Sequence, residues 1–238
     1  IKVSDNTYAV PVGLYYDPIS MIQIDLMEQG WFAVAGRDGG GKRNLLGVIF
    51  DHLYKNMFQC PADVFIVDSV DRKLAAFEEY GIVQEYTIDA SDVIQYIEDI
   101  YVELTQRYQE SAVENVNLSD EALKLVVIRN QDAIDMIEKN AAALKEYKEL
   151  IGKLKSMKVC FIFMDIANVP IPYNASPIMK SIKETKNFFY FDELQNLKLC
   201  DISTVTLRKF KKKLVKGDCY WLTGNEIFKS KIVKREEG

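Results

Sequence analysis

A glycine-rich turn followed by one lysine is the part of this sequence that could do chemistry. Gly36, Gly41 and Lys42 have the spacing of a glycine, four residues and then Gly-Lys, and Gly39 and Gly40 lie inside it. In this pattern, the phosphate loop (P-loop), backbone N–H groups surround phosphates and the lysine reaches the terminal ones. We therefore predict a nucleotide site. The alternative is that the glycines only form a tight turn, with Lys42 solvated.

The residues expected to hold a metal ion are missing. A P-loop has Ser or Thr after its lysine, because that hydroxyl binds Mg²⁺, whereas this chain has Arg43. The second signature is an acid at the end of a buried strand, and the strand predicted at 123–128 ends in Arg129 and Asn130. Asp132 follows, but we expect it in the next helix. We predict that ATP binds weakly or not at all, that no metal binds, and that the isolated domain does not hydrolyse ATP.

Arginine at two of these positions leaves another chemistry open. Arg43 and Arg129 can pair with phosphate or carboxylate groups without a metal. Asp165 is the best remaining carboxylate, although we interpret it as capping the turn after its strand. The lone histidine, His52, is expected on the surface or in packing rather than in catalysis.

Composition indicates an ordinary globular protein. The 238 residues are 48% hydrophobic and 27% charged, and the net charge of −5 gives no electrostatic reason to bind nucleic acid. No stretch is apolar and long enough to span a bilayer. The start, Ile1 to Ser4, lacks an initiator Met and a signal-peptide pattern, so we expect a fragment of a longer protein. The cysteines are expected to be reduced and buried, because they lack the paired spacing of zinc or redox sites: Cys60, Cys160, Cys200 and Cys219.

Apolar periodicity predicts an α/β fold, with a mainly parallel sheet flanked by helices, short N-terminal strands and a C-terminal β-hairpin. We expect a single domain over residues 1–238. The expected strands are 12–16, 22–26, 31–35, 64–67, 82–88, 123–128, 157–164 and 187–191, with a hairpin of 218–222 and 226–233. The expected helices are 43–58, 71–80, 92–111, one or two within 131–157, 176–185 and 204–216.

The last predicted helix carries a basic run: Arg208, Lys209, Lys211, Lys212, Lys213 and Lys216. We interpret it as a solvated amphipathic helix whose final lysines complement the helix dipole. A DNA-binding helix is the alternative.

The order of these motifs resembles a known family. The segment from Val12 to Pro18, the P-loop pattern from Gly36 to Lys42, the strand 124–128 and the closing segment from Gly217 to Glu226 together resemble an FtsK/SpoIIIE-type P-loop ATPase domain, with a RecA/FtsK-like fold. The chain looks most like the C-terminal, third ATPase domain of the EssC/EccC motors of bacterial type VII secretion, in the YukB-like branch. The resemblance covers essentially the whole chain.

The resemblance implies a cytoplasmic domain of a membrane-anchored protein with tandem ATPase domains. It implies secreted proteins of the WXG class as partners, together with the neighbouring ATPase domains of the same chain and self-association in the assembled motor. Gly36, Gly39, Gly41 and Lys42 match the first nucleotide motif, while Arg43, Arg129 and Asn130 depart from the family pattern.

Three hypotheses follow. The leading one is a catalytically degenerate motor domain that acts in substrate recognition or regulation of export. The second is an ATPase domain that is active only in the assembled motor. The third is an FtsK-like DNA translocase, which rests on the basic run alone.

Overall fold

The computed structural model describes residues 8–113, 118–210 and 213–235, so Ile1 to Ser4 lie outside the described residues. The described residues group into two compact units. Unit 1 holds residues 8–10, 24–31, 50–113 and 118–162, and unit 2 holds residues 11–23, 32–49, 163–210 and 213–235. That the chain is one ATPase-like domain over residues 1–238 stays a prediction.

Five elements run through both units because the chain passes between them: β1 (Ala9–Tyr16), β2 (Ile19–Asp25), β3 (Trp31–Gly36), α2 (Lys42–Lys55) and β7 (Val159–Ile166). The elements within unit 1 are α1 (Leu26–Gln29), β4 (Ala62–Val67), β5 (Val83–Thr87), α3 (Asp92–Val113), β6 (Leu123–Ile128), α4 (Gln131–Lys139) and α5 (Ala141–Ile151). Those within unit 2 are α6 (Pro177–Thr185), β8 (Phe188–Phe191), α7 (Thr204–Lys209), β9 (Asp218–Thr223) and β10 (Glu226–Ile232).

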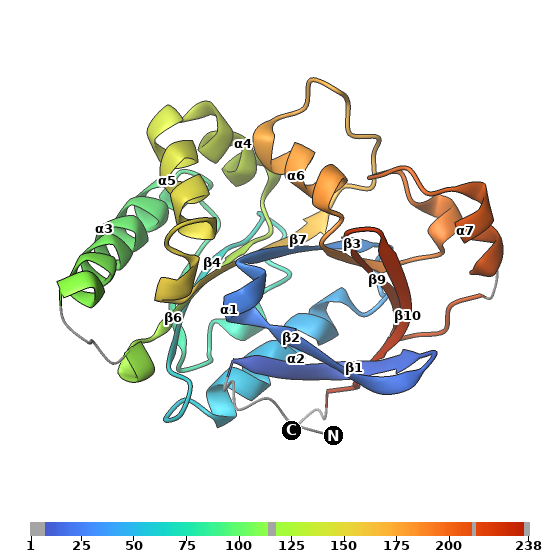
Figure 1. Cartoon of the computed structure of the whole chain (residues 1–238), viewed down its shortest axis with the longest axis horizontal. Helices are drawn as coiled ribbons and strands as arrows, with labels where there is room; N and C mark the ends of the chain where they lie inside the picture. Colours follow the sequence, from blue (N-terminus) through green and yellow to red (C-terminus); the bar gives the residue numbers. More distant parts are fainter. Residues whose placement is uncertain (1–7, 114–117, 211–212, 236–238) are drawn as a thin grey trace. The chain divides into compact units, whose positions relative to one another are not determined.

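Unit 1 is a parallel α/β arrangement. Strand β4 pairs in parallel with β5 and with β6, and Val64 is in register with Leu125. All six residues of β6 are buried, which explains why its sequence is a continuous apolar run instead of an alternating one. In Figure 1, α3 and α5 lie side by side. Tyr147 of α5 packs edge-on against Phe161 of β7, with ring centroids 5.0 Å apart.

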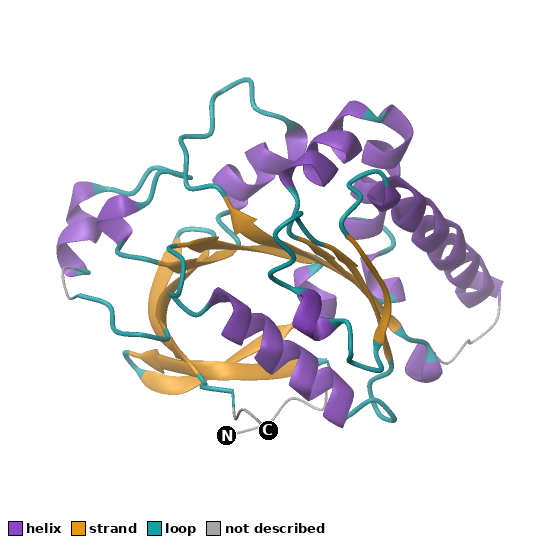
Figure 2. Cartoon of the chain, turned by 180° about the vertical axis from the view of Figure 1, so that it is seen from behind, coloured by secondary structure: helices purple, strands orange, loops and turns teal. Residues whose placement is uncertain are grey.

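Unit 2 combines a parallel pair with an antiparallel run. Strand β3 pairs in parallel with β8, whereas β8–β9, β9–β10 and β10–β1 are antiparallel, so the strand order is β2-β1-β10-β9-β8-β3. Figure 2 shows the strong curvature of the antiparallel part. Aromatic rings fill its core: Phe189 packs edge-on against Phe32 and stacks on Trp221. The predicted α/β fold, including the N-terminal strands and the C-terminal hairpin, is confirmed.

The prediction of a helix at 71–80 is wrong. Only a 3₁₀ turn, Ala75–Phe77, forms there. The buried Asp68 carboxylate at the end of β4 accepts hydrogen bonds from Ser69 N at 2.8 Å and from Leu74 N at 2.7 Å. These bonds hold the segment as a loop, since a side chain that satisfies backbone N–H groups competes with helix formation.

The helix predicted at 204–216 is too long. It ends at Lys209, and Lys211 and Lys212 lie outside the described residues. Beyond them, the Asp218 carboxylate accepts a hydrogen bond from Val215 N at 3.2 Å, and the chain turns into β9 through Gly217, which has a φ of 86°. A basic helix reaching residue 216 therefore does not form. The solvated amphipathic helix interpreted from the sequence is wrong in its extent, and the DNA-binding alternative loses the same helix.

Candidate phosphate-binding site

The loop between β3 and α2 has the backbone geometry that requires glycine. Gly36, Gly39 and Gly41 have φ angles of 123°, 71° and 122°, a region that residues with a side chain rarely occupy. Gly40 N donates to Arg37 O at 3.3 Å, which closes the turn. The helix then begins at Lys42, where the sequence pattern placed the lysine of the P-loop.

Two positions of the loop have no room for a side chain, because Phe191, the last residue of β8, lies against them. A Cβ atom added to Gly36 would lie 2.6 Å from Phe191 N, and one added to Gly40 would lie 2.8 Å from Phe191 O. The loop therefore packs directly on the backbone of the neighbouring strand. The sequence does not identify Phe191 as a residue of this site, because only its position at the end of the predicted strand 187–191 distinguishes it.

Lys42 is buried, not solvated. It is 7% exposed, and its ammonium lies within reach of three oxygens of unit 2. Lys42 Nζ donates a hydrogen bond to Gly36 O at 2.6 Å and forms an ion pair with Asp165 Oδ1 at 2.8 Å. A third oxygen, Asp38 Oδ1, lies 3.5 Å away on a carboxylate that is 82% exposed. The interpretation of this lysine as a solvated helix start is wrong.

Asp165 belongs to this site. It lies near the end of β7 in a left-handed conformation, with a φ of 56°, which aspartate tolerates better than most residues. Its side chain is 22% exposed and pairs with Lys42. The sequence favours Asp165 as a turn cap over a site carboxylate, whereas the ion pair with Lys42 supports the site carboxylate.

Arg43 is exposed on the first turn of α2, at the position where a P-loop has its metal-binding hydroxyl. The next residue, Asn44, attaches the C-terminal segment to the same helix. Asn44 Nδ2 donates to Val233 O at 2.6 Å, and Arg235 N donates to Asn44 Oδ1 at 2.9 Å. The sequence predicts no role for Asn44, which simply follows Arg43, the residue that departs from the P-loop pattern.

Arg129 stands at the second nucleotide motif, where the family pattern has an acid, and it is paired with carboxylates of unit 1. Its Nη1 donates to Asp68 Oδ1 at 2.8 Å, and its guanidinium pairs in a bidentate manner with Asp71. The hydrogen bond from Arg129 lowers the pKa of Asp71 from 3.8 to about 2. Because two carboxylates already neutralise Arg129, it is a poor candidate for the anion site proposed from the sequence.

Asn130 and Asp132 have local roles at the start of α4. Asn130 is the N-cap, and its Oδ1 accepts from Asp132 N at 3.0 Å and from Ala133 N at 3.3 Å. Asp132 lies in the first turn of α4 and is exposed, as expected from its spacing. Within the described residues, no group of three His, Cys, Asp or Glu side chains could hold a metal ion.

The remaining candidates lie apart from phosphate chemistry. His52 is on α2 and half-buried. All four cysteines are buried and free, as predicted. Burial is the main reason that the pKa values of Cys160 and Cys219 are raised, so these thiols stay protonated.

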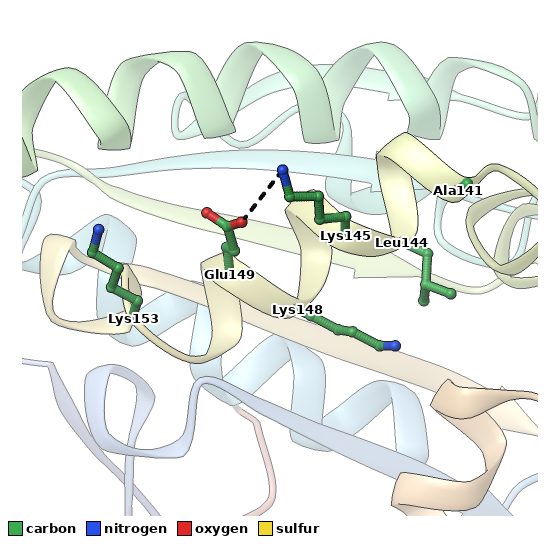
Figure 3. Close-up of a pocket in the computed structure, with 6 residues that line it drawn as sticks. All are labelled: Ala141, Leu144, Lys145, Lys148, Glu149 and Lys153. Atoms are coloured by element: carbon green, nitrogen blue, oxygen red, sulfur yellow. Dashed lines mark ion pairs between the residues drawn. The ribbon is translucent and has the colours of Figure 1, made fainter.

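A shallow pocket of about 450 Å³ lies on α5 and the turn after it in unit 1 (Figure 3). Lysines border an apolar floor there, and Lys145 pairs with Glu149 at 3.9 Å. Its lining residues are Ala141, Leu144, Lys145, Lys148, Glu149 and Lys153. None of the residues predicted for the phosphate site lines it.

No protein-family model matches the chain. A curated relative, the ESX secretion system protein YukB of Bacillus subtilis strain 168, is 26% identical over 159 residues, which are 63% of this chain and 10% of YukB. Within the described part of the chain, every helix is too short or too polar to cross a membrane.

Solved structures show the same fold. A structure of EssC from Geobacillus thermodenitrificans, containing ATPases 2 and 3, has a TM-score of 0.72 and 17% identity, and the match covers 98% of this chain and 42% of that one. The type VII secretion ATPase EccC of Thermomonospora curvata has a TM-score of 0.67 and 17% identity, with 97% of this chain and 26% of that chain covered. Its ATPases 2 and 3 are also solved in complex with a signal sequence peptide. This chain spans less than half of each of these proteins. It is thus similar to the ATPase domains of EssC and EccC, which confirms the resemblance predicted from the sequence.

Proposed function

We propose that this chain is an ATPase-like domain of a type VII secretion motor that retains a phosphate loop, does not hydrolyse ATP by itself, and acts in substrate recognition and regulation of export. The similarity to YukB, EssC and EccC supports the secretion motor. The degenerate character rests on the site residues.

The observation that carries this proposal is that the loop is intact while the positions for the metal ligands are occupied by residues of other function. Gly36, Gly39 and Gly41 hold the loop conformation, and Lys42 reaches back to it. In contrast, Arg43 offers no oxygen to a cation. P-loop hydrolysis depends on Mg²⁺ to neutralise the charge that develops on the phosphates, so a loop without the metal ligands supplies binding and not turnover.

The loop residues fit a phosphate group and do not fit Mg²⁺. Backbone N–H groups at the start of α2 favour negative charge, and Lys42 adds a cation beside them. At the second motif, Asn130 directs its Oδ1 to the backbone of α4 and Arg129 is paired with Asp68 and Asp71. ATP would therefore bind by its phosphates alone, and weakly.

The recognition role is supported by a relative. EccC of Thermomonospora curvata is solved, as ATPases 2 and 3, in complex with a signal sequence peptide, and this similarity supports a recognition role for the present chain. For this chain we propose secreted proteins of the WXG class as partners, and neighbouring ATPase domains of a membrane-anchored parent as its surroundings. Self-association would follow from assembly of that parent. ATP, bound without being hydrolysed, would serve as a structural or regulatory ligand.

Equilibrium binding of a fluorescent ATP analogue, with and without Mg²⁺, tests the phosphate site. We expect weak binding that does not require Mg²⁺ and is lost in Lys42→Ala. Lys139→Ala is the matched control, because it removes an equivalent charge from a side chain that is 80% exposed. Hydrolysis by the isolated domain that Lys42→Ala abolishes would refute the degenerate assignment. Turnover at this site only in the assembled parent would favour the second hypothesis.

The recognition role needs a separate measurement. The signal sequence peptide solved with EccC is a defined probe, and its binding to the purified domain can be followed by fluorescence anisotropy. Saturable binding that a scrambled peptide does not reproduce would support the role. Binding of neither peptide at millimolar concentration would count against it.

A further inference from the structure

We propose that Asp165 is an internal counter-anion that occupies Lys42 and sets the affinity and selectivity of the loop for polyphosphate. A ligand can use the lysine only by displacing the Asp165 carboxylate. This inference rests on the proposed phosphate site and names the residue of the chain that controls it.

Lys42 is not available to a ligand as it stands. Its ammonium is buried and has Gly36 O at 2.6 Å, Asp165 Oδ1 at 2.8 Å and Asp38 Oδ1 at 3.5 Å. An ammonium has three N–H donors and no acceptor. A phosphate oxygen that approaches Lys42 therefore competes with oxygens that are already in place.

Of these three oxygens, that of Asp165 is the one a ligand must displace. Gly36 O belongs to the backbone of the loop, and the contact with Phe191 holds that backbone in position. Asp38 is far more exposed than Asp165, 82% against 22%, and its oxygen is farther from the lysine, so water and salt screen its attraction. Asp165 is closer and better shielded, so it holds the lysine more strongly.

Carboxylates already lie beside Lys42 where an incoming anion would bind. Asp165 and Asp38 both pair with the lysine, so they offset its attraction for an anion. A singly charged anion offers no more than the carboxylate it would replace. A polyphosphate brings several charges and can also accept hydrogen bonds from the loop backbone. Asp165 should therefore exclude small monovalent anions and admit a phosphate chain.

The test is equilibrium binding of a fluorescent ATP analogue, without divalent cations, to the wild-type domain and to Asp165→Asn. Asparagine has nearly the same shape and also tolerates the left-handed φ of 56° at this position, so we expect the fold to be kept. Removing the carboxylate should tighten binding at least tenfold. Thermal unfolding checks that the variant is folded.

Two further variants locate the effect. Asp38→Asn removes the same charge from the exposed aspartate, and we expect the affinity to change less than threefold. In the Lys42→Ala background, Asp165→Asn should not restore binding, because the lysine that the carboxylate occupies is no longer there. The chloride dependence of binding should also increase in Asp165→Asn, since a monovalent anion then competes for the free lysine.

The outcomes separate this inference from the proposed function. Binding that is lost in Lys42→Ala but unchanged or weakened in Asp165→Asn would leave the phosphate site standing and overturn the role of Asp165. No binding by any variant up to millimolar nucleotide would overturn the site itself, and the inference with it.

Discussion

The Arg129 guanidinium donates a hydrogen bond to Asp68 Oδ1 across 2.8 Å, and the Asp68 side chain is completely buried. Arg129 follows β6 and Asp68 follows β4, two strands that pair in parallel. Arg129 stands where the sequence pattern would have an acid, and it forms a structural ion pair there. The arginine satisfies a buried charge, since a buried carboxylate without a cation is costly.

Arg129→Ala should lower the free energy of unfolding by about 3 kcal/mol, because it leaves a buried carboxylate without its cation. The backbone hydrogen bonds to Asp68 from Ser69 and Leu74 remain, which keeps the loss at the lower end of the usual range. Urea unfolding measures it. Lys139→Ala is the control, since its pair with Asp135 is exposed and should be worth less than about 0.5 kcal/mol.

Arg129→Asp, the change that restores an acid to the motif, should be more destabilising than Arg129→Ala. It places a third carboxylate beside Asp68 and Asp71, where like charges repel. We expect no gain of hydrolysis. An Arg129→Asp variant that is as stable as the wild type would show that the pair with Asp68 contributes little.

Stability should fall on acidification because of Asp71. Its pKa is about 2 in the folded protein, below the ordinary value of 3.8, mainly because Arg129 donates a hydrogen bond to it. A lowered pKa gives a contribution that is complete above about pH 4 and is lost as the pH falls toward 2. Asp71→Asn should flatten the pH dependence of unfolding over that range, and added salt should weaken the effect because the side chain is 44% exposed.

The sequence predicted the fold better than the contacts of the site, and particular residues show why. Buried strands such as Leu123–Ile128 are predictable from local apolar runs. The pair of Lys42 and Asp165 joins residues far apart in the sequence, and no local pattern specifies such a contact. The segment 71–80 has helical spacing, yet hydrogen bonds to Asp68 hold it as a loop, which is a tertiary effect on local propensity.

Gly36→Ala should disrupt the loop more than Gly39→Ala does. A Cβ at Gly36 would lie 2.6 Å from Phe191 N, while one at Gly39 would have no atom within 4 Å. Gly39→Ala should cost only the left-handed strain, about 1–2 kcal/mol. We expect Gly36→Ala to cost more than that and to abolish nucleotide binding, as measured by thermal unfolding and analogue fluorescence. Equal effects of the two variants would mean that the loop is free to move away from β8.

The four cysteines should be unreactive in the folded protein. Burial raises the pKa of each thiol, and a thiolate is needed for alkylation. Iodoacetamide at neutral pH should modify none of them in native buffer and all four in urea, as counted by intact mass spectrometry. Rapid labelling of Cys200 in native buffer would show that its surroundings open readily.

Asn130 should matter for stability and not for turnover. Its Oδ1 caps α4, and its Nδ2 donates to Asp68 O at 3.0 Å. Asn130→Ala should cost about 1 kcal/mol or somewhat more, because the cap is lost together with this donor. Asn130→Asp keeps a cap, but it loses the donor and places a carboxylate oxygen against Asp68 O, so it should also be destabilising. It also returns a carboxylate to the second nucleotide motif. Since Arg43 still provides no metal-binding hydroxyl, we expect no ATP hydrolysis from this variant in a phosphate-release assay. Turnover by Asn130→Asp alone would show that one missing carboxylate, and not the whole metal site, keeps the domain inactive.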